Sequence, residues 1–196
     1  MFFSGSIKDL VQLFSALPGV GSKSAQRMCS YILKQDKSYG LRLSKVIKDV
    51  ISSYKNCTIC NILTQKQVCP ICSDENRDQS KLCVVENSED VFLIEQAKIF
   101  NGYYFVLGKL LSPLEGVGVE DINLDKLLKL LSQKKVSEII FAINPTSEGE
   151  TTISYLSDKL KEYDLTRLAT GLPFGGDLHY TTPMTIASAI KGRLKV

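Results

Sequence analysis

The sequence contains a single histidine, His179, among its 196 residues. Catalytic triads and many zinc sites rely on imidazole nitrogens as bases or ligands. A lone histidine in the segment 177–180 is more typical of a surface loop residue than of a catalyst. The sequence therefore disfavours a histidine-based hydrolase and a histidine-rich metal site.

Long apolar runs are also missing, and no stretch approaches the roughly 18 apolar residues that a membrane-spanning helix needs. The first six residues lack the basic region and apolar stretch of a secretory signal. We therefore expect a cytoplasmic protein, associated with the nucleoid if it binds DNA, with no membrane partner. In that reducing compartment the six cysteines would stay as thiols, which favours metal binding over disulfides.

Four of the six cysteines form two C-x-x-C pairs, Cys57 with Cys60 and Cys69 with Cys72, separated by eight residues. Each pair closes a tight turn, so the two turns can supply four thiolates to one tetrahedral zinc ion. The residues between the pairs are mostly polar and too few to build a core of their own. The spacing predicts one structural zinc; two disulfides, or a redox C-x-x-C beside unrelated cysteines, are the alternatives. Cys29 and Cys83 lie in apolar segments and are expected in the core.

Charge is distributed unevenly along the chain. Residues 1–56 contain nine basic and three acidic side chains, a net charge of +6, whereas the remainder carries −3. A basic module on a slightly acidic body is typical of binding to a polyanion through that module. A solvated helical surface without a partner would have the same composition.

Apolar periodicity predicts helices before the cysteines and strands that alternate with helices after them. Helical spacing extends from Ile7 to Phe14, through Ala25, Met28 and Ile32, and along 43–51. Short apolar runs at 82–85, 104–107, 139–143 and 165–169 predict buried strands. Further helices are expected at 88–97, 124–132, 151–161 and 182–193. Strand–helix alternation favours an α/β fold with a parallel sheet.

A glycine-rich break at 17–21 separates the first two predicted helices. Gly19 and Gly21 permit a sharp turn with open N–H groups, and Ser22 could cap the helix that follows. Lys23 and Arg27, four residues apart, would share a helix face beside this hairpin, so both cations could reach one phosphate backbone. The pattern resembles a helix-hairpin-helix DNA-binding motif; a hairpin that only packs against another subunit is the alternative.

Carboxylates follow two of the predicted strands: Glu86 after the first, and Glu148 and Glu150 after the third. In open α/β sheets, sites form beyond the carboxyl ends of strands. The arrangement resembles the Toprim domain of topoisomerases, primases and small nucleases. In type IA topoisomerases two aspartates precede such glutamates, and Asn144 and Thr146 stand in their place here. Because Mg²⁺ prefers anionic oxygen ligands, we expect no catalytic residue here; the glutamates could also simply favour a helix N-terminus.

The order of these features over nearly the whole chain resembles the RecR family of bacterial recombination mediator proteins. The matching segments are 17–28, 82–86, 112–116, 144–150, 175–178 and 189–193. The resemblance implies four parts: a helix-hairpin-helix module at 1–53, a four-cysteine zinc finger at 54–78, a Toprim domain at 79–176, and a C-terminal segment with a helix at 177–196.

The resemblance also implies a function without an enzymatic step. Such proteins work with RecO and RecF in the repair of single-strand gaps, where they help to load RecA, and they assemble as ring-like homotetramers around DNA. Glu86, Glu148 and Glu150 would then form a docking surface for RecO. The sequence departs from the family at Lys109, where a second glycine is usual. It also departs at His179, Thr182 and Pro183, where acidic residues are usual. A metal-dependent Toprim nuclease or topoisomerase, and a structural zinc-stabilised oligomer, remain as alternatives.

Overall fold

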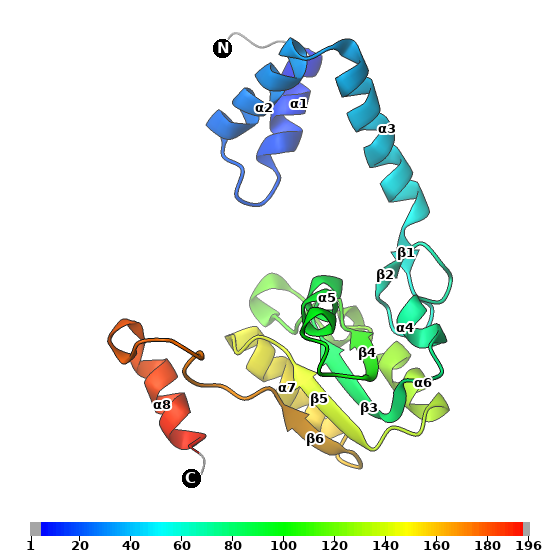
Figure 1. The fold of residues 1–196 in the computed structure, drawn as a ribbon, viewed down its shortest axis with the longest axis vertical. Coiled ribbons are helices and arrows are strands. Elements are labelled where there is room, and N and C mark those ends of the chain that lie inside the picture. Colours follow the sequence, from blue (N-terminus) through cyan, green and yellow to red (C-terminus); the bar gives the residue numbers. More distant parts are fainter. Residues whose placement is uncertain (1–4, 194–196) are drawn as a thin grey trace. The chain divides into compact units, whose positions relative to one another are not determined.

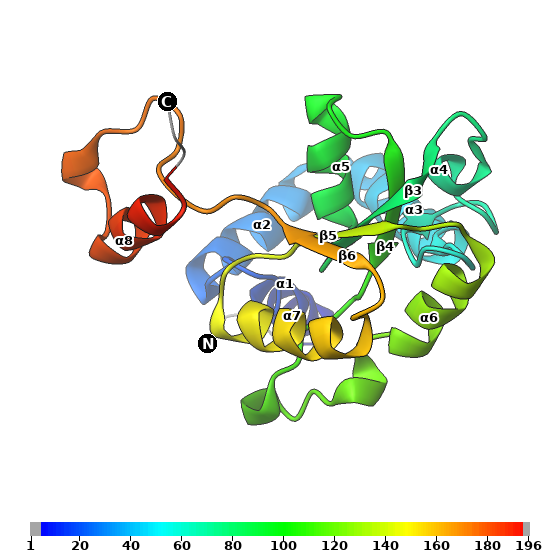
Figure 2. The same ribbon diagram turned by 90° about the horizontal axis from the view of Figure 1, so that it is seen from below.

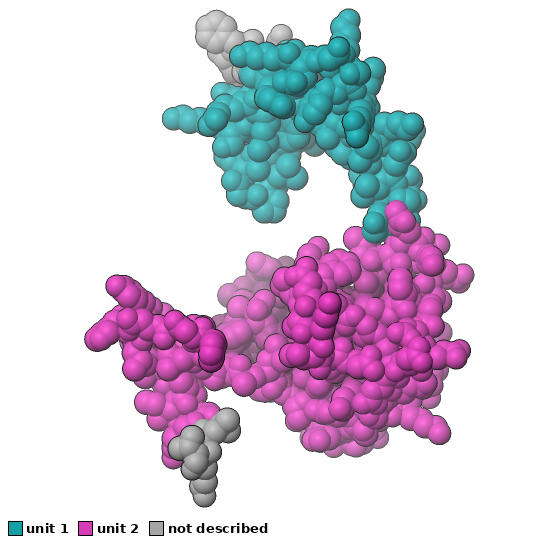
Figure 3. Space-filling model, viewed as in Figure 1, with its two compact units in different colours: residues 1–54 teal, residues 55–196 magenta. Residues whose placement is uncertain are grey.

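The computed structural model describes residues 5–193, so the outer ends of the first and last expected domains lie outside the described residues. The chain folds into two compact units, residues 1–54 and 55–196 (Figure 3). Within the described part, no helix is both long and apolar enough to cross a bilayer.

Unit 1 consists of three helices, α1 (Ser6–Ser15), α2 (Ser22–Lys34) and α3 (Lys37–Ser53) (Figure 1). The glycine-rich break falls between α1 and α2, as the sequence predicts. The predicted cap is wrong, because Gly21 is the N-cap residue of α2 and Ser22 is already helical. Helix α3 does have a side-chain cap, since Asp36 accepts a hydrogen bond of 2.8 Å from the backbone N–H of Ser38.

Unit 2 is built on a parallel sheet with the strand order β4-β3-β5-β6. The strands are β3 (Asp78–Val85), β4 (Gly102–Val106), β5 (Glu138–Ala142) and β6 (Asp164–Arg167). Helix α5 (Ser88–Ala97) covers one face, and α6 (Leu124–Gln133) and α7 (Ser147–Lys159) cover the other (Figure 2). This is the arrangement that right-handed crossovers require, because β3 connects to β4 in one direction and β5 to β6 in the other. The predicted α/β class is confirmed.

The core of unit 2 lies between the sheet and its helices. Leu82, Phe105 and Ile139 are fully buried on the strands, and Val91 and Leu156 are fully buried on the helices that cover them. Apolar runs on central strands bury both faces, which explains why these strands read as continuous apolar segments. Cys29 and Cys83 are buried in units 1 and 2 respectively, as expected.

The four-cysteine segment packs at one end of this sheet. It contains β1 (Lys55–Asn56), β2 (Leu63–Thr64) and the short helix α4 (Pro70–Ser73), with β1 and β2 antiparallel. Ile62 and three of the cysteines belong to the same buried cluster as the sheet residues. The segment, too short for a core of its own, therefore shares the core of the α/β sheet.

Several elements begin or end at other residues than the sequence predicts, and residues at the helix starts account for two of these differences. Helix α7 begins at Ser147 rather than 151, because Thr146 caps it by accepting from the Gly149 N–H at 3.1 Å. The last helix, α8, spans Pro183–Lys191, and Pro183 occupies its first position, where a missing N–H costs nothing. The remaining short turns are η1 (Pro113–Glu115), η2 (Val119–Asp121) and η3 (Leu178–Tyr180).

Candidate metal centre, DNA interface and carboxylate edge

The structure brings the four cysteines of the two C-x-x-C pairs together. The Sγ atoms of Cys57, Cys60, Cys69 and Cys72 all lie within 4.8 Å of one another. The sulfurs of Cys60 and Cys69 are 3.4 Å apart. Four sulfurs bound tetrahedrally to zinc at about 2.3 Å lie about 3.8 Å from one another. The cluster therefore has the composition and spacing of a four-thiolate metal site.

Local hydrogen bonds support thiolate character in this cluster. The backbone N–H of Cys69 points to the Cys57 sulfur at 3.3 Å, and that of Cys72 to the Cys69 sulfur at 3.4 Å. The pKa of the Cys60 thiol is raised far above its ordinary value. The largest cause is the contact with the Cys57 sulfur, followed by the contacts with the other two sulfurs and by burial. Four thiolates this close together, three of them buried, repel one another, so a divalent cation is needed to hold all of them charged. These residues fit a bound metal ion, which would supply structural cross-linking rather than chemistry.

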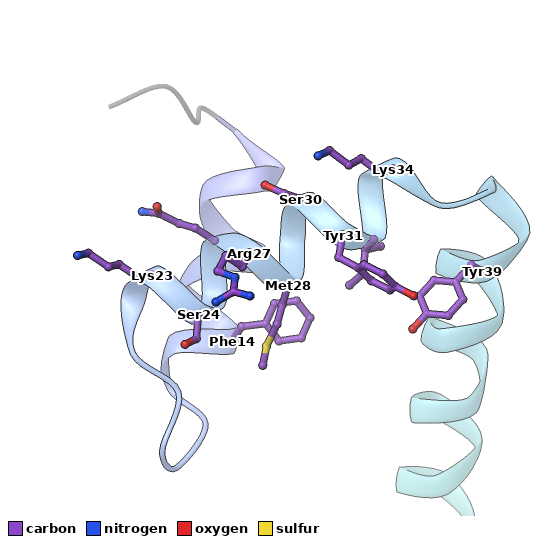
Figure 4. Close-up of a pocket in the computed structure, with 11 residues that line it drawn as sticks. Phe14, Lys23, Ser24, Arg27, Met28, Ser30, Tyr31, Lys34 and Tyr39 are labelled. Atoms are coloured by element: carbon purple, nitrogen blue, oxygen red, sulfur yellow. The ribbon is translucent and has the colours of Figure 1, made fainter.

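The glycine hairpin lies between α1 and α2. Gly19 has a φ of 76°, a left-handed conformation that glycine adopts without strain. Gly21 precedes the first turn of α2, and Lys23 and Arg27 are exposed on that helix. Figure 4 shows Lys23 and Arg27 on successive turns of α2. All four predicted DNA-binding residues therefore belong to one surface, at the hairpin and the start of α2.

A hollow of about 1060 Å³ opens beside Arg27 in unit 1 (Figure 4). Phe14, Met28 and Tyr31 contribute apolar surface to it, and Lys23 and Arg27 also line it. Tyr31 packs edge-to-face against Tyr39 of α3, with ring centroids 6.0 Å apart. This apolar lining beside the cations is a feature that charge counting alone did not reveal.

Glu86 and Glu148 lie at the carboxyl ends of β3 and β5, where the direction of strand connection reverses, and we call this surface the carboxylate edge. Ligand sites in open α/β sheets form at this switch point. A cleft of about 410 Å³ is lined there by Glu86, Asn144, Thr146 and Glu148. Lys109 lines the same cleft, and its Nζ lies 3.5 Å from Oδ1 of Asp121. Glu115 adds a third carboxylate, which the sequence reading did not single out.

Glu150 does not line this cleft. Its Oε2 accepts a hydrogen bond of 3.0 Å from Nη1 of Arg167, at the end of β6. It lines a neighbouring hollow of about 690 Å³ instead. Of the three glutamates predicted to act together, the structure brings Glu86 and Glu148 into one cleft and pairs the third with an arginine.

The cleft is poorly suited to a catalytic magnesium ion. Beside its carboxylates, Asn144 and Thr146 present only neutral oxygens to the cleft. Among residues 5–193, the cysteine cluster is the one group of three or more potential ligands whose donor atoms converge. The carboxylates of the cleft thus provide a negative surface with one lysine beside it rather than a metal cage.

Two family models match this chain. The model of the RecR helix-hairpin-helix matches residues 7–51, which contain the glycine hairpin, Lys23 and Arg27. The Toprim domain model matches residues 80–169, from within β3 to just beyond β6. A helix-hairpin-helix of this type followed by a Toprim domain is the combination characteristic of RecR, and the four-cysteine cluster lies between the two. The chain therefore belongs to the RecR family.

Proposed function

We propose that this protein is a DNA-binding recombination mediator for the repair of single-strand gaps. It acts as a homotetrameric, ring-like clamp that works with RecO and RecF in the cytoplasm, at the nucleoid, and helps to load RecA. The observation that carries this proposal is the match to a RecR helix-hairpin-helix together with a Toprim domain that lacks both metal-binding aspartates. One structural zinc per chain, held by the four cysteines, stabilises the segment between these two parts.

DNA binding is assigned to Gly19, Gly21, Lys23 and Arg27. The glycines expose backbone N–H groups, the N-terminus of α2 carries a partial positive charge, and both cations are exposed. Contacts of this kind are made to phosphates, so binding is independent of sequence and falls steeply with salt.

The double variant Lys23→Glu/Arg27→Glu tests this assignment. We expect its affinity for single- and double-stranded DNA to fall at least about 100-fold at low salt, because two attractions become repulsions. Lys129→Glu/Lys135→Glu makes the same change in net charge at exposed positions of unit 2 and should bind nearly as tightly as the wild type. Fluorescence anisotropy over a range of salt concentrations measures both. Equal losses in the two variants would mean that total charge, and not the hairpin, governs binding.

Partner docking is assigned to the carboxylate edge, with RecO as the partner. Glu86 and Glu148 share one cleft, and Glu150 contributes from the adjacent surface despite its pairing with Arg167. A negative surface attracts a basic partner and adds salt-sensitive contacts at the rim of an interface.

Alanine variants separate these contributions. We expect Glu86→Ala/Glu148→Ala to weaken RecO binding about tenfold at low salt, and Glu150→Ala to weaken it less, because Arg167 already neutralises that carboxylate. DNA binding by unit 1 should not change in either variant. Isothermal titration calorimetry with purified RecO is the measurement, and unchanged affinity in the double variant would remove the docking role.

The alternative function is that of a Mg²⁺-dependent nuclease or topoisomerase. The observation in its favour is that the carboxylates of Glu86 and Glu148 line the same cleft. Incubation with supercoiled plasmid and Mg²⁺ distinguishes the two functions. The mediator produces no nicking or relaxation at any concentration. Cleavage that is abolished by Glu86→Ala would establish the enzyme instead.

A further inference from the structure

Asn61, the residue after the metal ligand Cys60, connects the cysteine segment to the sheet. It is 4% exposed and has a φ of 64°, a left-handed conformation that asparagine tolerates better than most residues. Its Nδ2 donates to the Val106 carbonyl at 2.9 Å, and its Oδ1 accepts from Lys126 Nζ at 3.2 Å. The NH₂ group and the oxygen of the buried side-chain amide are therefore both hydrogen-bonded. A glycine at position 61 would adopt the same backbone conformation but would make neither hydrogen bond.

Val106, the last residue of β4, is held by the cysteine segment through both of its backbone polar groups. Its N–H donates to the Cys60 carbonyl at 2.9 Å, and its carbonyl accepts from Asn61. A metal ligand and its neighbour thus take the place of an additional strand at this point. Both polar groups of this buried strand end therefore depend on the position of the Cys60 turn.

The chain that follows Val106 leads directly to the carboxylate edge. The Leu107 N–H donates to the Val85 carbonyl at 3.0 Å, and the Gly108 N–H donates to the Glu86 carbonyl at 2.9 Å. Gly108 and Lys109 line the same cleft as Glu86. Only Leu107 therefore separates Val106, which the cysteine segment holds, from Gly108, whose N–H bonds the Glu86 carbonyl.

A second connection reaches the other side of Glu86. The N–H of Leu63, in β2 of the cysteine segment, donates to Oγ of Ser88 at 2.9 Å. Ser88 is buried and is the first residue of α5, two positions after Glu86. The cysteine segment thus contacts the end of the neighbouring strand, at Val106, and the first residue of the helix that follows Glu86, at Ser88.

We propose that the metal-bound cysteine segment positions the carboxylate edge, with Asn61 and Ser88 as the positioning residues. Loss of the metal then loosens the Cys60 turn, releases Val106 and Ser88, and lets Glu86 and Lys109 move. A basic partner that docks on this edge would bind only the metal-loaded protein well. This last consequence rests on the proposed docking function, whereas the positioning itself does not.

Hydrogen exchange of the full-length protein tests the positioning. Asn61→Asp keeps the size and the left-handed preference of the side chain but replaces the donor to Val106 with a carboxylate oxygen. We expect exchange of the Val106 and Gly108 amides to become about threefold to tenfold faster, with one zinc per chain retained. Thr58→Val, which removes a hydroxyl that bonds only Gln67 within the segment, is the matched control and should leave these amides unchanged.

Metal removal supplies the second arm. Wild-type protein treated with a chelator should show faster exchange in peptides that cover 84–90 and 103–110, and little change in those that cover 138–142. Unchanged exchange at Val106 and Gly108 in both Asn61→Asp and the chelated protein would overturn the proposal. If RecO does not bind even the zinc-loaded wild type, the docking function fails, and the exchange data still decide the positioning.

Discussion

At the scale of single residues, a charged network holds the cysteine segment against the sheet. Arg77 pairs with Glu95 of α5, and its Nη1 also donates to the Gly102 carbonyl at 2.8 Å. The Tyr104 hydroxyl donates to Glu95 Oε1 at 2.7 Å. The guanidinium carbon lies 5.9 Å from the centre of the Tyr104 ring. A largely buried arginine of this kind is tolerated because its charge and most of its donors have partners.

This network predicts a measurable pH dependence. Burial alone would raise the pKa of Glu95, but hydrogen bonds from Arg77 and Tyr104 outweigh it and lower that pKa below the ordinary value of 4.5. The stabilising contribution is therefore fully present above pH 4.5 and is lost as the pH falls through the lowered pKa. We expect Glu95→Gln to reduce the free energy of unfolding by about 1–2 kcal/mol at pH 7.

Urea denaturation of wild type and Glu95→Gln at several pH values checks this prediction. The difference in unfolding free energy between the two should shrink as the pH is lowered from 5 to 3. The zinc content of both proteins is measured at each pH, so that only conditions with equal metal content are compared. A difference that stays constant over this range would show that the Glu95 carboxylate makes no titrating contribution to stability.

At the scale of secondary structure, the start of α7 depends on a close backbone contact. A Cβ atom added to Gly149 would lie 2.0 Å from the Asn144 carbonyl oxygen. The absence of a side chain lets the first turn of α7 pack on the loop after β5, so that Glu148 faces the cleft. This explains why a segment rich in polar residues and glycine forms a helix earlier than apolar periodicity predicts.

Gly149→Ala should therefore destabilise unit 2 by at least about 2–3 kcal/mol, because backbone atoms must move to make room. Gly40→Ala in α3 is the control, and we expect it to raise the free energy of unfolding rather than lower it. Its new Cβ would make ordinary contact at 3.6 Å with Ile32, and alanine favours a helix interior by about 1 kcal/mol over glycine. Thermal unfolding by circular dichroism measures both. A neutral Gly149→Ala would mean that the loop after β5 yields easily.

At the scale of the whole molecule, unit 1 leaves much apolar surface uncovered. Ala25 and Cys29 are its buried apolar residues among those described, whereas Ile47 and Ile51 of α3 are 49% and 74% exposed. Val46 and Val50 lie half exposed on the same helix. Apolar surface of this extent is typical of interfaces between subunits, in agreement with the proposed homotetramer.

We expect Ile47→Glu/Ile51→Glu to lower the oligomer mass measured by light scattering, because two charges would be buried at an apolar contact. The helical content should stay unchanged, since neither side chain is part of the core. Ser38→Glu/Ser52→Glu adds the same charge at exposed positions on the opposite side of α3 and should retain the wild-type mass. Identical masses for the two variants would exclude this face of α3 as an interface.

Local patterns predicted much of this structure because their causes are local. The C-x-x-C spacing determines a turn that directs two sulfurs together, and continuous apolar runs such as 139–143 indicate a strand covered on both faces. The cap at Ser22 was wrong because glycine competes well at an N-cap when the preceding turn requires it. The start of α7 was missed because its signals, a threonine cap and a glycine contact, are not apolar.

The sequence by itself determined which four cysteines could share one metal ion, which segments are strands, and where the glycine hairpin separates two helices. Only the tertiary structure decided how these parts act on one another. Asn61 contacts Val106, which is 45 residues away in the sequence, and Leu63 contacts Ser88, which is 25 residues away. Arg167 pairs with Glu150, 17 residues before it, and Glu150 does not line the cleft. Such contacts depend on the order of strands and on the packing of the sheet. Periodicity and spacing report only on near neighbours, so they cannot specify contacts between residues this far apart in the chain.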